Sequence, residues 1–150
     1  TIVCLTGDGS LMFNLQELAT LRRIDTNVAV IVFDNDGYNS IRTSQDAHLG
    51  GRHFGSHLQW LGFPDWRTLA QAFDYRYMDI ATNDAIDRIG AAMGEGHWLV
   101  RVRIDPERGR TPRLVSKIKD GKFVSPTIFD QYPELPAETE AAYAALKARL

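Results

Sequence analysis

Apolar residues form four short runs, separated by stretches in which they recur every three or four positions. Three of these runs, near residues 2–6, 28–33 and 97–104, are rich in aliphatic and β-branched side chains, and together with a shorter segment near 76–80 they predict four strands. The stretches between them predict helices, and strands that alternate with helices form a parallel sheet. The pattern therefore predicts an α/β fold, a parallel sheet with helices on both faces.

Three of the predicted helices are each identified by one apolar stripe. The first stripe consists of Leu11, Leu15, Leu18 and Leu21. The second belongs to a helix with Asp65 as its expected N-cap and consists of Trp66, Leu69, Ala70 and Phe73. The third belongs to a helix opened by Asn83 and consists of Ile86, Ile89 and Met93. A shorter helix is expected over residues 39–45, before a long loop that ends at Pro64.

The character of the chain changes after residue 104. A charged stretch is interrupted by Pro106, Pro112, Pro126, Pro133 and Pro136. These prolines predict an extended arm, with a hairpin turn at Asp120-Gly121 and a final helix over residues 137–150. We therefore expect residues 1–104 to form the α/β domain, and residues 105–150 to be a C-terminal arm and helix of the same domain.

The composition is that of a globular protein, with 150 residues of which 44% are hydrophobic and 24% charged. A net charge of −2 argues against binding to nucleic acid or to an anionic membrane, and no apolar run approaches transmembrane length. Cys4 lies in a strand expected to be buried, where it serves as a small apolar residue. The chain starts inside a predicted strand without an initiator Met, so we expect a piece of a longer protein, with the cytoplasm as its default location.

Two short polar loops follow the first two predicted strands. Gly7-Asp8-Gly9-Ser10 ends the first strand, and Asn35-Asp36-Gly37-Tyr38 lies just past the second. The carboxyl ends of neighbouring parallel strands meet at the edge of the sheet where open α/β sheets bind ligands. We therefore expect the two loops to lie together, although both are also ordinary turn sequences.

The residues of these loops suit a Mg²⁺-diphosphate site. Gly7 and Gly9 leave the backbone open to a bulky anion, and Ser10 is a natural helix N-cap before a turn with free N–H groups. Asp8 supplies a carboxylate oxygen, Asn35 supplies an amide oxygen, and the turn after Asn35 supplies a backbone carbonyl. Mg²⁺ favours such hard oxygens and completes its shell with phosphate and water.

The double motif resembles the cofactor-binding motif of thiamine diphosphate-dependent enzymes. The similarity extends through Asn14-Leu15-Gln16-Glu17-Leu18-Ala19-Thr20, which resembles the helix after this motif in the acetolactate synthase-like group. The resemblance implies the thiamine diphosphate-binding fold, with thiamine diphosphate and Mg²⁺ as cofactors. It implies that Mg²⁺ is bound by the side chains of Asp8 and Asn35 and by the backbone oxygen of Gly37. The implied cofactor-binding set is Gly7, Asp8, Gly9, Ser10, Asn35, Gly37 and Tyr38.

The resemblance covers essentially the whole chain, as the C-terminal diphosphate-binding domain of a longer enzyme. In that family the catalytic glutamate comes from a pyrimidine-binding domain of the same or another subunit, and nothing in this sequence matches that domain. Glu17 is instead expected on the solvent or capping side of its helix. No catalytic residue is therefore assigned to this chain, and the fragment alone is expected to be inactive. The resemblance also implies a homodimer or homotetramer.

For the complete enzyme, the resemblance implies a carboligase or decarboxylase that acts on a 2-oxo acid or a related carbonyl compound. Ser44 stands where acetolactate synthases proper usually carry a tryptophan, which leaves the substrate open. Two alternatives remain, a hydrolase of a cyclic dione that uses the same cofactor and a non-catalytic scaffold. The intact set of Asp8, Asn35 and Gly37 disfavours the scaffold.

The long loop after the second motif contains His48, His53 and His57. Their spacing matches no metal-binding pattern, so we expect them to be solvated or locally hydrogen-bonded. Gln45 and Arg52 are candidates for contact with a substrate carboxylate, although exposure at the surface is the commoner fate of such an arginine.

Overall fold

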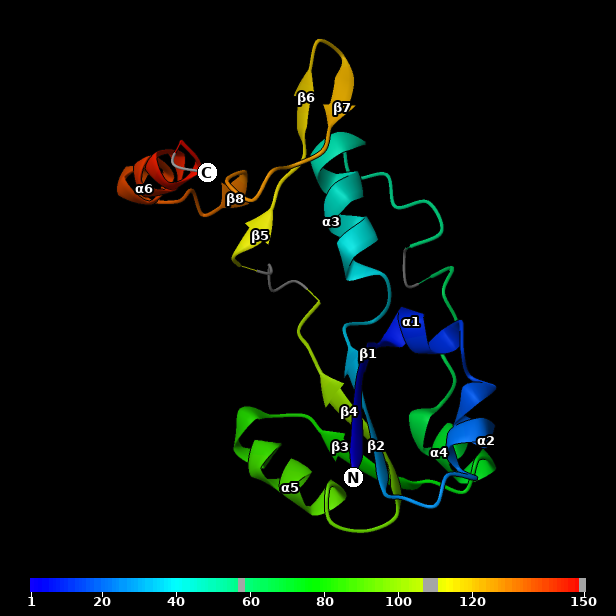
Figure 1. The fold of residues 1–150 in the computed structure, drawn as a ribbon. Coiled ribbons are helices and arrows are strands. Elements are labelled where there is room, and N and C mark those ends of the chain that lie inside the picture. Colours follow the sequence, from blue (N-terminus) through cyan, green and yellow to red (C-terminus); the bar gives the residue numbers. More distant parts are fainter. Residues whose placement is uncertain (57–58, 107–110, 149–150) are drawn as a thin grey trace. The chain divides into compact units, whose positions relative to one another are not determined.

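The computed structural model describes residues 1–56, 59–106 and 111–148. The chain divides into two compact units, residues 1–107 and 108–150 (Figure 1). The first unit contains a four-stranded sheet with the order β1-β2-β4-β3, in which every neighbouring pair is parallel. Its strands are β1 (Ile2–Gly7), β2 (Val28–Asp34), β3 (Arg76–Ile80) and β4 (His97–Arg103). The predicted strands and the predicted parallel α/β class are confirmed.

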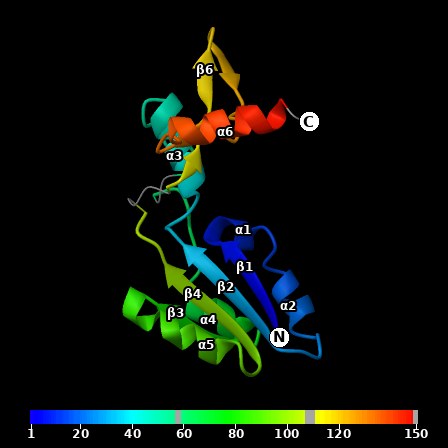
Figure 2. The same cartoon turned by 60° about the vertical axis from the view of Figure 1, so that its left-hand side comes forward.

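Helices lie on both faces of this sheet (Figures 1 and 2). One face packs against α1 (Asp8–Met12), α2 (Glu17–Leu21) and α4 (Trp66–Ala72). The other face packs against the 3₁₀ helix η1 (Asn83–Arg88) and against α5 (Ile89–Ala92). A further helix, α3 (Asn39–His48), follows the second polar loop. The expected N-cap of α4 is confirmed, because the Asp65 side chain accepts a hydrogen bond from the Thr68 N–H at 2.8 Å.

The central strand β2 supplies both halves of the core. Val28, Val30 and Val32 belong to the cluster under α1, α2 and α4, whereas Ile31 belongs to the cluster under η1 and α5. A strand buried on both faces needs a nearly continuous apolar run, which is what the sequence of β2 provides. The two loops of interest leave the sheet from the ends of β2 and of its neighbour β1.

The expectation that the first strand is buried is wrong for much of β1. Val3 is 41% exposed and Leu5 is 63% exposed, and Cys4 is only half-buried against the core. β1 is an edge strand, and the helices on the face that Val3 and Leu5 occupy pack on β3 and β4 instead. The apolar pattern predicted the position of the strand correctly, but it did not predict that the strand is exposed.

Two predicted helices differ from expectation in their form. The first is divided into α1 and α2, and the residues between them form turns with hydrogen bonds to the third preceding residue, such as Asn14 N–H to Leu11 O. Leu11 and Leu18 are nevertheless buried as predicted. In the third helix the first part is the 3₁₀ helix η1, and Ile86 and Met93 are exposed rather than inward. A 3₁₀ helix has three residues per turn, so an α-helical stripe does not hold across it.

The second unit consists of short strands and one helix. β6 (Lys117–Lys119) and β7 (Lys122–Val124) form the predicted hairpin, and the turn residues Asp120 and Gly121 both have positive φ, as a tight hairpin turn requires. The other elements are β5 (Arg113–Leu114), which pairs antiparallel with β8 (Gln131–Tyr132), and α6 (Ala137–Lys147). Among the described helices, none combines the length and the apolar character needed to cross a bilayer.

Candidate functional site

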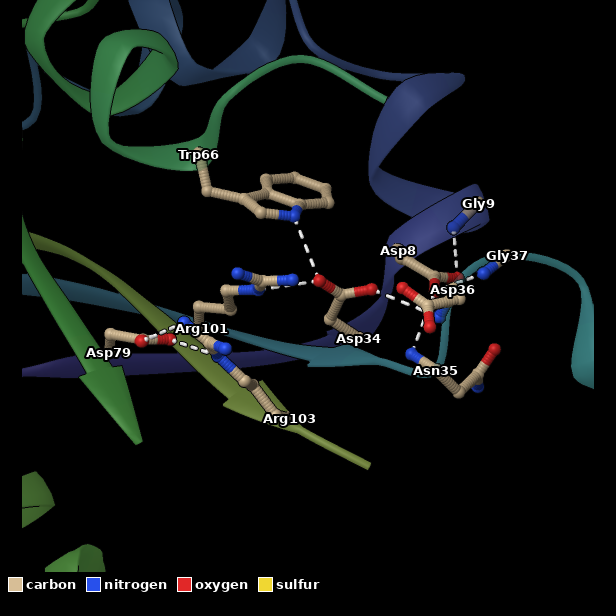
Figure 3. A network of polar contacts seen from close by, with 10 residues as sticks. All are labelled: Asp8, Gly9, Asp34, Asn35, Asp36, Gly37, Trp66, Asp79, Arg101 and Arg103. Atoms are coloured by element: carbon tan, nitrogen blue, oxygen red, sulfur yellow. Dashed lines mark hydrogen bonds and ion pairs between the residues drawn. The ribbon is translucent and has the colours of Figure 1, made fainter. Parts of the chain in front are cut away.

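Asp8 joins the two predicted loops. It is the first residue of α1, directly after β1, and only 3% of it is exposed. One carboxylate oxygen, Oδ2, accepts hydrogen bonds from the N–H groups of Asn35 at 2.9 Å and Gly37 at 2.7 Å. The other oxygen, Oδ1, accepts a hydrogen bond from the N–H of Gly9 at 2.6 Å. A single buried carboxylate therefore ties the end of β1 to the loop after β2 (Figure 3).

The charge of Asp8 is only partly compensated. Burial raises the pKa of its carboxyl above the ordinary value, and the N–H groups of Gly37, Asn35 and Gly9 act in the opposite direction. The nearby carboxylate of Asp34 adds to the upward shift of the Asp8 pKa. A cation beside Asp8 would offset both the cost of burying its charge and the repulsion from Asp34.

The second loop makes a left-handed turn. Asp36, Gly37 and Tyr38 have φ values of 59°, 85° and 49° in succession. Left-handed backbone costs about 1–2 kcal/mol for each residue with a side chain. The hydrogen bonds to Asp8 offset part of this cost, and the turn directs the N–H groups of the loop toward the carboxylate.

Gly9 permits the two loops to touch. A Cβ atom at Gly9 would lie 2.4 Å from a ring carbon of Tyr38, so the aromatic ring rests directly against the glycine backbone. Gly9 was predicted to leave its backbone open to a bulky anion, and in this structure the ring of Tyr38 lies against that backbone.

We expect Gly9→Ala to destabilise the protein by about 1–3 kcal/mol, because the new methyl group overpacks the contact with Tyr38. The measurement is urea unfolding of the full-length protein, followed by fluorescence. Gly62→Ala is the matched control, since a Cβ there meets no atom within 4 Å. A second substitution, Tyr38→Ala, should remove most of the cost of Gly9→Ala, and strict additivity of the two changes would contradict the proposed contact.

Ser10 does not have the role predicted for it. The helix begins three residues earlier than expected, so Gly7 rather than Ser10 is the N-cap of α1, in an extended conformation and without a side-chain capping bond. Ser10 lies inside the first turn and is exposed. The structure therefore brings together Asp8, Gly9, Asn35, Gly37 and Tyr38 of the predicted set, with Gly7 and Ser10 adjacent in sequence.

The oxygens offered by the two loops fit Mg²⁺ in kind. The Asp8 carboxylate has about four acceptor positions, of which the three N–H groups use three. Among the residues that the structure describes, the amide oxygen of Asn35 receives only a long contact, 3.4 Å, from the N–H of Asn39. Over the described residues, no three His, Cys, Asp or Glu side chains cluster to hold a metal. A metal here would thus depend on amide, backbone and phosphate oxygens, which Mg²⁺ accepts.

An ionic network lies next to the second loop and was not predicted. Oδ2 of Asp34, at the end of β2, accepts hydrogen bonds from Nε1 of Trp66 at 2.9 Å and from Nε of Arg101 at 2.6 Å. The other oxygen of Asp34 accepts from the N–H of Asp36 at 3.1 Å (Figure 3). The sequence signal was an acid and an arginine within apolar strands, which indicates a buried ion pair.

The alternating arginines of the last strand, Arg101 and Arg103, are typical of a partly wet face or of an edge strand, but they do not mark an edge here. β4 lies inside the sheet between β2 and β3. Arg101 pairs with Asp34, and Arg103 forms an ion pair with Asp79 at 2.5 Å.

Residues of the long loop have local partners. Nε2 of His53 lies 2.6 Å from Oδ1 of Asp46, as expected for a locally hydrogen-bonded histidine, whereas His57 lies outside the described residues. Gln45 is buried, donates to the carbonyl of Phe54 at 3.0 Å and accepts from the hydroxyl of Ser56. In this structure the side chain of Gln45 is thus engaged within the loop, whereas Arg52 is exposed. Glu17 is exposed at the start of α2, as predicted.

Comparisons with known proteins give one family. Residues 1–102 match the model of the family described as "Thiamine pyrophosphate enzyme, C-terminal TPP binding domain". The chain is 34% identical over 87 residues to the acetolactate synthase large subunit of Haemophilus influenzae, and the aligned region covers 58% of this chain and 15% of that protein. It is 32% identical over 107 residues to the acetolactate synthase isozyme 2 large subunit of Escherichia coli, and the aligned region covers 70% of this chain and 19% of that protein.

A solved structure has a similar fold. The thiamine diphosphate-dependent 4-hydroxybenzoylformate decarboxylase of Rhodococcus jostii RHA1 superposes with a TM-score of 0.61 at 22% identity, over 70% of this chain and 20% of that one. The chain thus spans between 15% and 20% of the length of these three proteins. The predicted family, fold class and cofactor, thiamine diphosphate with Mg²⁺, are confirmed at the level of the family. The chain belongs to the thiamine pyrophosphate enzyme family, as its C-terminal TPP-binding domain.

Proposed function

We propose that this chain anchors Mg²⁺ and the diphosphate of thiamine diphosphate within a longer acetolactate synthase-like enzyme, a carboligase or decarboxylase of 2-oxo acids. The observation that carries the proposal is the position of Asp8. Its buried carboxylate is bonded to the N–H groups of Asn35 and Gly37, so the proposed ligands come from two loops that are already held together.

Each residue has a distinct role in this proposal. Asp8 supplies the charged ligand, Asn35 the amide oxygen and Gly37 the backbone oxygen of the Mg²⁺ site. The diphosphate is bordered by Gly7, Gly9, Ser10 and Tyr38. When bound, the thiazolium ring of the cofactor supplies an electron sink for carbanion chemistry at the substrate carbonyl.

The remaining parts of the active site are proposed to lie elsewhere in the assembly. A pyrimidine-binding domain of the same or another subunit supplies the catalytic glutamate, and the complete enzyme is a cytoplasmic homodimer or homotetramer. The acetolactate synthases and the decarboxylase named above support a 2-oxo acid as the substrate class. Release of CO₂ from pyruvate by the full-length protein is the expected result, and hydrolysis of a cyclic dione without CO₂ release would replace this proposal with the hydrolase.

We expect the full-length protein to retain thiamine diphosphate on desalting in Mg²⁺ and to lose it after EDTA, because the metal links the carboxylate to the diphosphate. Mass spectrometry of the released cofactor is the measurement, and restoring Mg²⁺ with fresh cofactor should restore retention. If no cofactor is retained under either condition, the scaffold interpretation takes precedence.

A further inference from the structure

Asn39 links three parts of the chain near the edge of the sheet where the two loops lie. It is the first residue of α3 and is only 8% exposed. Its Nδ2 donates to the carbonyl oxygen of Pro106 at 2.7 Å, and its Oδ1 accepts from the hydroxyl of Thr43 at 3.2 Å. Its backbone N–H makes the long contact, 3.4 Å, with the amide oxygen of Asn35. One buried residue thus lies between the second loop, α3 and the chain that leaves β4.

Residues 104–106 form the root of the C-terminal arm and are held beside the end of β2. The N–H of Ile104 donates to the carbonyl oxygen of Asp34 at 2.7 Å, which continues the pairing of β4 with β2 past the ends of both strands (Figure 2). The bond from Asn39 holds the next part of the arm root. Proline has a fixed φ and no N–H, so its carbonyl is the backbone group through which the chain can be bound at Pro106.

The second loop and α3 are also joined to each other. Arg42, one turn inside α3, donates to three consecutive carbonyl oxygens of the loop, those of residues 35–37. Asn39, at the start of the same helix, joins this assembly to the arm root. Proteins open locally in cooperative units, and the contacts within a unit decide what opens together. These contacts make the second loop, the first turn of α3 and the arm root one such unit.

We propose that Asn39 couples the two loops to the C-terminal arm, so that a ligand bound at the loops also restrains the arm root. While the bond to Pro106 is intact, the arm root opens together with the second loop. By linkage, a ligand that stabilises the loop then lowers the frequency with which the arm root opens. The part of this proposal that concerns a ligand rests on the proposed function. The part that concerns the arm root does not, because the contacts of Asn39 are those of the chain alone.

The first test is amide hydrogen exchange in the full-length protein without cofactor. Asn39→Asp keeps the size of the side chain and the acceptor for Thr43, and it replaces the donor to Pro106 by an oxygen that repels the carbonyl. The N–H of Ile104 should then exchange about 5-fold faster or more, as loss of a hydrogen bond predicts. The N–H groups of α3 should not exchange faster, because negative charge in the first turn stabilises a helix.

Thr43→Val is the matched control for this test. It removes the other side-chain bond of Asn39 with little change of volume and leaves the donor to Pro106 in place. The exchange rate of Ile104 should therefore stay at the wild-type value. An unchanged rate in Asn39→Asp, or an equal increase in both variants, would overturn the role of Asn39 at the arm root.

The second test repeats the measurement with saturating thiamine diphosphate and Mg²⁺. In the wild type the N–H of Ile104 should exchange about 5-fold more slowly or less, as for ordinary coupling between two sites. In Asn39→Asp the ligand should still slow the exchange of the Gly37 N–H but no longer that of Ile104.

A merely structural role of Asn39 would leave the response of Ile104 to the ligand equal in both proteins, and that result would overturn the coupling. A wild type that binds the cofactor without any change at Ile104 would overturn it as well. If the wild-type protein binds no thiamine diphosphate, the proposed function fails, and the first test still decides whether Asn39 holds the arm root.

Discussion

Asp8→Asn in the full-length protein is expected to abolish Mg²⁺-dependent retention of thiamine diphosphate. The substitution removes the one charged ligand of the proposed site. It also places an amide NH₂ group where one carboxylate oxygen now accepts, either opposite the N–H of Gly9 or opposite those of Asn35 and Gly37. Loss of groups that merely orient metal ligands costs about 10–100-fold in affinity, so loss of the ligand itself should weaken Mg²⁺ binding by about 100-fold or more.

The control for this experiment lies in the same pair of loops. Asp36 is an exposed aspartate of the second loop, and asparagine tolerates its positive φ. Asp36→Asn therefore removes the same charge while leaving the proposed ligands in place, and it should retain the cofactor as the wild type does. Asn35→Ala should behave like Asp8→Asn. Retention at the wild-type level in both Asp8→Asn and Asn35→Ala would disprove the assignment of the metal ligands.

The strands and the convergence of the two loops were predictable because they follow from local chemistry. β2 is a nearly continuous apolar run, and parallel strands bring their carboxyl ends to one edge of the sheet. The forms of the helices were less predictable. The stripe of Leu11 and Leu18 is preserved by two short helices joined by turns, and the sequence does not distinguish this arrangement from one continuous helix.

The residues that support the site were missed for two physical reasons. Arg42 binds backbone carbonyl groups, and every residue has one, so no sequence pattern marks its partners. Asp34 and Arg101 are paired across neighbouring strands that are far apart in sequence, so the pair becomes visible only when the strand order is known. Ser10 was misassigned as an N-cap because a helix beginning at Asp8 has no side-chain cap at all.

Asp34→Ala is expected to be the most destabilising single change in the sheet beneath the site, at about 3–5 kcal/mol. The carboxylate is 3% exposed, and its loss leaves the buried indole N–H of Trp66 and the guanidinium of Arg101 without their acceptor. Removing one partner of a buried ion pair costs this much because the remaining charge is uncompensated. The measurement is the free energy of opening from amide exchange in β2 and β4, which is local and therefore usable in the full-length protein.

A neighbouring ion pair provides the comparison that makes this expectation specific. Arg103 and Asp79 form the same kind of contact across β4 and β3, but their side chains are 51% and 26% exposed. Asp79→Ala should therefore cost about 1 kcal/mol or less, as for ion pairs that water screens. Asp34→Asn should fall between the two, because it keeps an acceptor for Trp66 and loses the charge opposite Arg101. Equal costs for Asp34→Ala and Asp79→Ala would mean that burial does not set the strength of the Asp34 network. The rigidity of the second loop, which Asp34 also binds through the N–H of Asp36, would then have to come from Asp8 and Arg42 alone.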